Sequence, residues 1–161
     1  MGHGNRMMGK PKPETWNDFF SRPSEVPADF LQKETEEPEI INLHTKESRA
    51  ALTRMVTRLF DLWQISITDQ AAILHRSIST IRRYQNGGCI GANQAILDRV
   101  GLLMGIHKNL RILYPYNRDL VYRWISAKNS HFDDRTPLDI MKKNDEGLRS
   151  IRGYLESTVN S

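Results

Sequence analysis

The stretch TDQAAILHRSISTIRRYQNG, residues 68–87, contains two short amphipathic segments joined by a very short turn. The spacing of its apolar residues predicts one helix over about 68–74 and a second over about 78–86. Thr68 and Ser77 are hydroxyl residues able to cap these helices, and the Asn-Gly-Gly sequence that follows would end the second. Two short helices with so tight a connection are typical of a helix-turn-helix.

Several positions in this stretch fit the geometry of a DNA-binding helix-turn-helix. Ala71 supplies the small residue that lets the second helix cross the first closely. His75 stands where a glycine usually occupies the turn, and histidine is among the residues enriched in left-handed backbone. Leu74, Ile81 and Tyr84 supply apolar contacts to the interior. We therefore expect the second helix to be held against the body with its opposite face outward.

The outward face of the second helix carries the residues that a reader of the major groove needs. They are Ser77, Ile78, Ser79, Arg82 and Arg83. Arginine can bond guanine bidentately, which contributes roughly 1–3 kcal/mol of discrimination, and serine reaches phosphates or bases. Residues 46–90 hold 7 Lys and Arg against 3 Asp and Glu, a local excess that suits phosphate contact. Paired arginines also occur on ordinary solvated helices, but the tight turn, the capping serine and the local basicity together favour DNA contact.

The flanking sequence predicts further helices, each with one apolar face and several with recognisable start or stop signals. These helices are expected to begin at Lys46, near Ile96, near residue 118, at Pro137 and near residue 145. Pro115 would end the second of them, and Thr136 would cap the one that starts with Pro137. No run alternates with period two for long enough to form a strand, so the predicted fold class is all-α.

We divide the chain into three parts: a mobile leader over 1–45, a helix-turn-helix domain over 46–90 and a further helical domain over 91–161. The leader is rich in proline, glycine and acidic residues, a composition that buries little apolar surface. Its WNDFF segment is the exception and could dock on the body or on a second copy of the chain. Specific DNA binding normally needs two recognition helices about 34 Å apart, so we predict a homodimer. The Gly101 and Gly105 stripe, or the aromatic leader, would be places for its interface.

Other functional classes find little support in the sequence. The single cysteine, Cys89, argues for a reducing compartment and against a disulfide framework or a zinc cluster. Neither a signal peptide nor an apolar run of about 18 residues occurs, so we expect a soluble, cytoplasmic protein without membrane partners. His131, Asp133 and Asp134 are the only cluster of residue types that bind metals. No additional ligand from a distant part of the sequence is evident, so a metal site is not expected. With no phosphate-binding glycine loop and no nucleophile paired with a base, we expect neither an enzyme nor a cofactor.

Three segments of the C-terminal half, VGLLMGIHKNLRILYP (100–115), NSHFDDRTPLDIM (129–141) and GLRSIRGYLES (147–157), resemble the toxin-binding domain of Xre/MbcA/ParS-type antitoxins. The helix-turn-helix is similar to the one these antitoxins carry, so the resemblance covers roughly 46–158. Its most specific part is the F-x-x-R-T-P-L-D pattern that begins at Phe132. The chain departs from the family at Ser130, where proline is usual, and at Asp133 and Asp134, where glycines are usual.

This resemblance implies a type II antitoxin that is encoded beside a RES-domain toxin, which consumes NAD or transfers a group from it. Antitoxins of this kind cover the active site of the toxin with their C-terminal domain, and dimers or larger complexes bind the operator of their own operon. Residues 91–161 would then be the toxin-binding domain. Carried over position by position, the implied toxin-facing residues are Asn129, Phe132, Arg135, Thr136, Pro137, Arg149, Arg152, Tyr154 and Leu155.

Two other functions stay open at this point. The chain could be a stand-alone helix-turn-helix transcriptional regulator whose C-terminal domain only dimerises or binds a partner. It could also be a pure protein-binding module in which the helix-turn-helix no longer binds DNA. An adjacent reading frame with RES-type residues would favour the antitoxin over the regulator, and DNA binding separates both from the third possibility.

Overall fold

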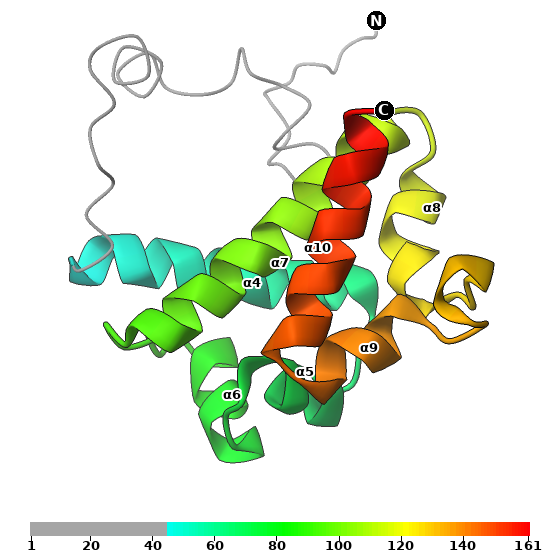
Figure 1. Ribbon diagram of the computed structural model, residues 1–161. Helices are drawn as coiled ribbons and strands as arrows, with labels where there is room; N and C mark the ends of the chain where they lie inside the picture. The colour runs from blue at the N-terminus through cyan, green and yellow to red at the C-terminus, as the bar shows by residue number, and fades with distance from the viewer. Residues whose placement is uncertain (1–44) are drawn as a thin grey trace, which may run out of the picture. The chain divides into compact units, whose positions relative to one another are not determined.

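The computed structural model describes residues 45–161, and this part of the chain is helical (Figure 1). Its elements in order are α4 (Lys46–Trp63), α5 (Ile67–Leu74), α6 (Ile78–Gln85), α7 (Gln94–Leu113), α8 (Arg118–Arg123), the 3₁₀ turns η2 (Trp124–Ser126) and η3 (Ser130–Phe132), α9 (Pro137–Lys143) and α10 (Asp145–Val159). Residues 45–161 form no strand beyond an isolated bridge between Asn129 and Arg135. The predicted all-α class is confirmed, and the expectations for the leader and its WNDFF segment lie outside the described residues.

Helix α4 begins at Lys46, as its sequence predicts. The Thr45 hydroxyl accepts a hydrogen bond from the Ser48 backbone N–H at 3.1 Å, which caps the first turn. The helix ends at Gln64, whose backbone is left-handed (φ 57°). The apolar stripe predicted for this helix lies against the interior, where Leu59 and Trp63 are almost completely buried. Helix α4 thereby packs against α6 and α7.

The centre of the described chain is the packing of α10 along α7, which Figure 1 shows side by side. Helix α10 buries Leu148, Ile151 and Leu155 on the face that packs on α7 and α9. A Cβ atom at Gly105 would lie 2.5 Å from the guanidinium carbon of Arg152, so the close approach that this glycine allows is made by the chain's own α10. At Gly101 nothing lies within 4 Å of such an atom, and this position faces open space.

Ion pairs join the last two helices to α7 and α5. Arg99 on α7 holds Asp145, at the start of α10, with Nε–Oδ1 and Nη2–Oδ2 distances of 2.8 and 3.3 Å. This bidentate hydrogen bond lowers the pKa of Asp145 below its usual value. On α9, Lys142 donates to Asp69 of α5 at 3.1 Å, and that bond raises the pKa of Lys142. The first pair thereby fixes α7 to α10, and the second fixes the helix-turn-helix to α9.

One histidine lies in the interior at the C-terminal half of α7. His107 is fully buried, and its ring stacks on Tyr122 of α8 with centroids 5.7 Å apart. Burial, with a smaller contribution from Arg111, lowers the pKa of His107 from 6.5 to about 4. Near neutral pH this imidazole is therefore uncharged and packs as part of the core. In the described part of the chain, none of the helices has both the length and the apolar character to cross a membrane.

Candidate functional site: two surfaces on one helical body

Helices α5 and α6 form the predicted helix-turn-helix, with one correction at its start. Helix α5 begins at Ile67, and its cap is Ser66, whose hydroxyl accepts from the Asp69 N–H at 3.1 Å. The predicted cap, Thr68, already lies in the first turn of the helix, where its hydroxyl cannot satisfy the N-terminal N–H groups. The predicted cap of α6 is confirmed, because the Ser77 hydroxyl accepts from the Thr80 N–H at 3.1 Å.

The turn between the two helices adopts the conformation predicted for His75. Its backbone is left-handed (φ 55°, ψ 48°), and the next N–H, of Arg76, closes the turn on the Ala71 carbonyl at 3.1 Å. Asp145 lies 3.8 Å from the Nε2 atom of His75 and so borders this turn. A histidine thus occupies the place of the usual glycine without opening the turn.

The residues predicted to read DNA lie on the outer side of α6. Ser77, Ser79, Arg82 and Arg83 are exposed and Ile78 is half-buried, whereas Ile81 and Tyr84 are buried on the opposite side. The guanidinium of Arg83 lies over the Tyr84 ring, 5.1 Å from its centroid, and donates to the Cys89 carbonyl at 3.4 Å.

Within residues 45–161 the Arg82 side chain makes no hydrogen bond or ion pair, so its guanidinium is available to a ligand. The sequence prediction omitted Asn86, which is exposed and follows Arg82 by four residues, on the same side of the helix. That spacing was visible in the sequence. Whether any of these side chains touches DNA stays a prediction.

A second surface lies beside α10, where four aromatic rings from three segments meet. We call Trp124, His131, Phe132 and Tyr154 the aromatic cluster. Tyr154 is at its centre, with ring centroids 4.3 Å from His131, 5.1 Å from Phe132 and 6.2 Å from Trp124. Trp124 is buried, Phe132 and Tyr154 are half-buried, and His131 is exposed. The structure therefore brings together two predicted toxin-facing residues, Phe132 and Tyr154, and adds two that the sequence prediction did not include.

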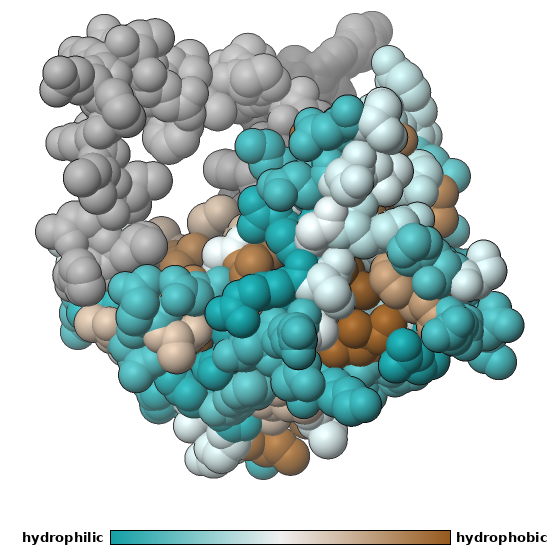
Figure 2. All heavy atoms as spheres, in the orientation of Figure 1, coloured by the Kyte–Doolittle hydropathy of each residue, from teal (hydrophilic) through white to brown (hydrophobic). Residues whose placement is uncertain are grey.

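The surroundings of the aromatic cluster are polar. Figure 2 shows an apolar patch beside α10 near α9 with hydrophilic surface around it; its colouring counts tryptophan, tyrosine and histidine as hydrophilic, so these three cluster residues are not part of that patch. Arg149 and Arg135 are exposed, and the Nε of Arg135 donates to the Phe132 carbonyl at 3.2 Å. Arg152 is half-buried and pairs with Glu156 at 3.3 Å. An apolar centre with a charged rim is typical of protein interfaces.

Four other predicted toxin-facing residues support the structure beneath this surface. The Asn129 side chain accepts from the His131 N–H at 2.9 Å, and the Thr136 hydroxyl accepts from the Asp139 N–H at 3.0 Å. Pro137 is buried at the first position of α9, and Leu155 is only 1% exposed. These four residues stabilise the loop before α9, the start of α9 and the packing of α10. Their effect on a partner would therefore be indirect.

The loop that carries Phe132 holds two consecutive left-handed residues. Asp133 and Asp134, at the positions where glycines are usual in the resembled family, have φ values of 59° and 62°. The Asn129 carbonyl accepts from the N–H groups of Phe132 and Asp134, at 2.9 and 3.0 Å. These hydrogen bonds keep the backbone in a conformation that aspartate tolerates less well than glycine.

This conformation makes a prediction about stability. Replacing Asp134 with glycine is expected to raise the free energy of unfolding by about 0.5–1 kcal/mol, because glycine adopts a left-handed backbone without steric cost. Replacing it with alanine removes the same carboxylate but keeps a Cβ, and should lower that free energy. Urea denaturation of the two variants separates the backbone effect from the charge, and equal stability of both would contradict the explanation.

Among residues 45–161, no three His, Cys, Asp or Glu side chains come close enough together to hold a metal ion. His131 instead packs its ring against Tyr154 and Phe132. Cys89, next to the end of the helix-turn-helix, donates through its thiol to the Ile90 carbonyl at 3.3 Å.

Comparison with known families agrees with both surfaces. Residues 43–105 match the model of the antitoxin Xre-like helix-turn-helix domain, and residues 109–158 match that of the antitoxin Xre/MbcA/ParS C-terminal toxin-binding domain. No curated protein matches the chain. The first match contains α4 to α6 and the second contains α8 to α10, including the aromatic cluster. The division between them falls inside α7.

Proposed function

The chain belongs to the antitoxins of the Xre/MbcA/ParS type, and from that membership we propose that it neutralises a RES-domain toxin and represses its own operon. It is a type II antitoxin with a helix-turn-helix domain and a toxin-binding domain, neither of which belongs to an enzymatic family. The observation that supports the proposal best is the placement of two accessible surfaces, α6 and the aromatic cluster, on different sides of one packed body (Figure 1).

Neutralisation would occur by obstruction of the toxin active site. The aromatic cluster offers a half-buried anchor, and Arg135, which donates to the Phe132 carbonyl, brings a positive charge beside it. Arg149 and Arg152 add positive charge elsewhere on α10. Tyrosine and arginine contribute most at protein interfaces because they combine a large contact area with hydrogen bonds. An arginine or the C-terminal segment ESTVNS (156–161) would then lie in the pocket that receives NAD and exclude this cofactor. No chemical step by the antitoxin is needed.

The central place of Tyr154 leads to a prediction for toxin binding. Tyr154→Ala is expected to weaken toxin binding roughly 30-fold, which corresponds to about 2 kcal/mol for a buried interface tyrosine. Surface plasmon resonance with the purified toxin measures this change. Tyr116→Ala is the matched control because Tyr116 is 99% exposed and lies outside the cluster, between α7 and α8. If the Tyr154 variant binds the toxin as the wild type does, the cluster is not the anchor.

Repression would follow from binding of α6 to operator DNA by a dimer of this chain, because one recognition helix contacts too few base pairs for specificity. Analytical ultracentrifugation with and without operator DNA tests the dimer. A chain that binds operator DNA specifically as a monomer would contradict it.

Co-expression with the adjacent reading frame tests the proposed function as a whole. We expect the neighbouring protein to deplete cellular NAD when expressed alone, to lose that activity with this chain, and to co-purify with it. The complex should retard DNA from upstream of the operon in a gel shift. Retarded DNA together with a neighbour that neither consumes NAD nor co-purifies would instead support the stand-alone regulator.

A further inference from the structure

One face of α7 is left largely uncovered by the other described helices. Its residues follow one another at intervals of three and four, the spacing that places side chains on one side of a helix: Gln94, Asp98, Gly101, Gly105, Lys108 and Ile112. We call this set the α7 face. All of its residues except Gly105 are exposed, and Gly105 is covered by Arg152 of α10. In Figure 1, α10 lies along one side of α7 and α4 passes behind it, which leaves the α7 face accessible to another chain.

The middle and one end of the α7 face carry apolar surface. Ile112 is 50% exposed and is one of two large hydrophobic side chains that are exposed within residues 45–161. Leu102 and Met104 lie on either flank of the face near its middle, and both are half-buried. A Cβ atom at Gly101 would meet nothing within 4 Å, so a second helix can approach closely there. Apolar surface with charged residues beside it is typical of protein interfaces.

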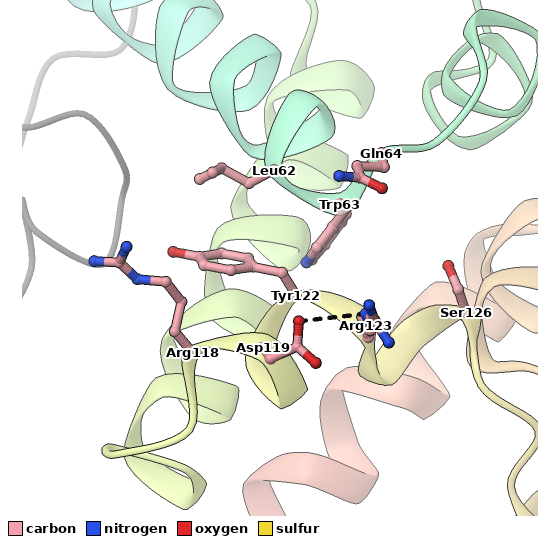
Figure 3. A pocket seen from close by; sticks show the side chains of 8 residues that line it. All are labelled: Leu62, Trp63, Gln64, Arg118, Asp119, Tyr122, Arg123 and Ser126. Carbon is pink, nitrogen blue, oxygen red and sulfur yellow. Dashed lines mark ion pairs between the residues drawn. The ribbon is translucent and has the colours of Figure 1, made fainter.

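Two charges on the α7 face have no ion-pair partner in the described part of the chain. Asp98 accepts a hydrogen bond from the neutral side chain of Gln94 at 2.7 Å, and it pairs with no cation of the described residues. Lys108 makes neither a hydrogen bond nor an ion pair with any of them. Helix α8 differs, because its Asp119 and Arg123 pair with each other at 3.3 Å (Figure 3). The charges of the α7 face are therefore open to a partner that presents opposite charges.

A second copy of the α7 face presents those opposite charges. Asp98 and Lys108 lie at equal distances in the sequence before and after Leu103. Two α7 helices that cross antiparallel at Leu103 therefore bring each Asp98 opposite the Lys108 of the other copy. A symmetric dimer uses the same surface twice and requires this self-complementarity. We propose that the α7 face is the dimer interface and that a second copy of this chain packs antiparallel on it. This inference rests on the dimer in the proposed function and adds where that dimer forms.

The antiparallel order also suits the two half-sites of an operator. At a rise of about 1.5 Å per residue, the two copies of Gln94 at the start of α7 would lie about 27 Å apart along the helix pair. Helix α6 precedes this end of α7 through the 86–93 loop, so the two recognition helices would be separated by a similar distance. Half-sites one helical turn apart are separated by about 34 Å. A parallel pair would instead bring both recognition helices to the same end of the dimer, too close together for two half-sites.

Charge reversal in the full chain tests the α7 interface. Asp98→Lys would place two lysines opposite each other at both ends of the helix pair, and Lys108→Asp would place two aspartates there. Each variant is expected to raise the dissociation constant of the dimer roughly tenfold or more, because two attractive pairs become repulsive. An equimolar mixture of the two variants should dimerise as the wild type does, because each chain then meets opposite charges at both ends. Sedimentation equilibrium measures these dissociation constants.

The charge reversals have a matched control in Lys143→Asp. This variant makes the same change of charge as Lys108→Asp, at an exposed position on α9, and should dimerise as the wild type does. Circular dichroism shows whether each variant keeps its helix content. Because Lys108 makes no hydrogen bond or ion pair with the described residues, Lys108→Asp compared with this control still tests the interface if Asp98→Lys does not fold.

The outcomes separate this interface from the dimer itself. Dimerisation that neither reversal weakens would place the interface elsewhere and overturn this inference, while the proposed dimer would stand. The inference is equally wrong if both reversals weaken the dimer and their mixture does not restore it. Loss of toxin binding in these variants with an unchanged dimer would assign the α7 face to the toxin and also overturn it. A wild-type chain that stays monomeric with operator DNA would overturn the dimer and its interface together.

Discussion

Operator binding by the Arg82→Ala, Arg83→Ala double variant is expected to be weaker than that of the wild type by roughly 30-fold to 10⁴-fold. Each arginine that bonds a base bidentately contributes roughly 1–3 kcal/mol, so the two together contribute roughly 2–6 kcal/mol. Both side chains are exposed on α6, and burial of this helix depends on Ile81 and Tyr84. Arg83 also lies over the Tyr84 ring and donates to the Cys89 carbonyl, so circular dichroism of the variant must show that its helix content is unchanged. Fluorescence anisotropy with labelled operator DNA measures the loss.

The salt dependence of binding distinguishes base contacts from phosphate contacts. An arginine that binds a phosphate contributes about one unit to the slope of log affinity against log salt, and its removal weakens all sequences alike. An arginine that reads a base changes the preference among sequences. Arg135→Ala with Arg149→Ala is the matched control, because it removes two exposed positive charges that lie outside the helix-turn-helix. Unchanged operator affinity in the α6 double variant would remove the assignment of α6 as the DNA-reading helix.

Acidification is expected to destabilise the protein by about 3 kcal/mol through His107 alone. This histidine has a pKa of 6.5 in the unfolded chain and about 4 in the folded one. Between these values the unfolded state binds more protons, so the free energy of unfolding falls as the pH drops below 6.5, and the loss is complete below about 4. Urea denaturation at a series of pH values from 7 to 4.5 follows the effect.

A neutral replacement isolates the contribution of His107. His107→Gln cannot be protonated, so its free energy of unfolding should change much less over that pH window. Asp145 contributes at lower pH. Its pKa is lowered from 3.8 by Arg99, so its contribution is present above 3.8 and is lost as the pH falls below that value. Asp145→Asn should therefore keep the decline above pH 4.5. A wild-type protein of constant stability from pH 7 to 4.5 would show that His107 accepts its proton without unfolding.

The fold was largely predictable because its signals are local. Helix starts at Ser77, Thr136 and Asn144 depend on one side chain and the N–H groups that follow it, and all three caps are present. The left-handed turn at His75 was predictable for the same reason. The error at Thr68 also has a local cause, because Ser66 and Thr68 are both hydroxyl residues near the helix start, and only the backbone conformation selects between them.

The second surface was less predictable because it depends on contacts between distant segments. Trp124, the loop before α9 and Tyr154 meet only after α8 and α10 have packed, so the sequence gives no spacing that joins His131 to Tyr154. The resemblance to known antitoxins supplied Phe132 and Tyr154 but could not separate exposed residues from supporting ones such as Leu155. The burial of His107 likewise arises from packing and has no sequence pattern of its own.

The position of α7 constrains how such antitoxins can be recombined. Its 20 residues run through the division between the two matched domains, and its buried residues, from Ile96 to Leu110, contribute to the core on both sides of that division. A hybrid that joins two antitoxins at the domain boundary would have its junction in the middle of α7. The side chains of α7 that pack on α10 would then come from two different proteins and would not fit together. A junction in the 86–93 loop would keep the helix intact. We therefore expect that a functional exchange of toxin-binding domains between antitoxins includes the whole of α7.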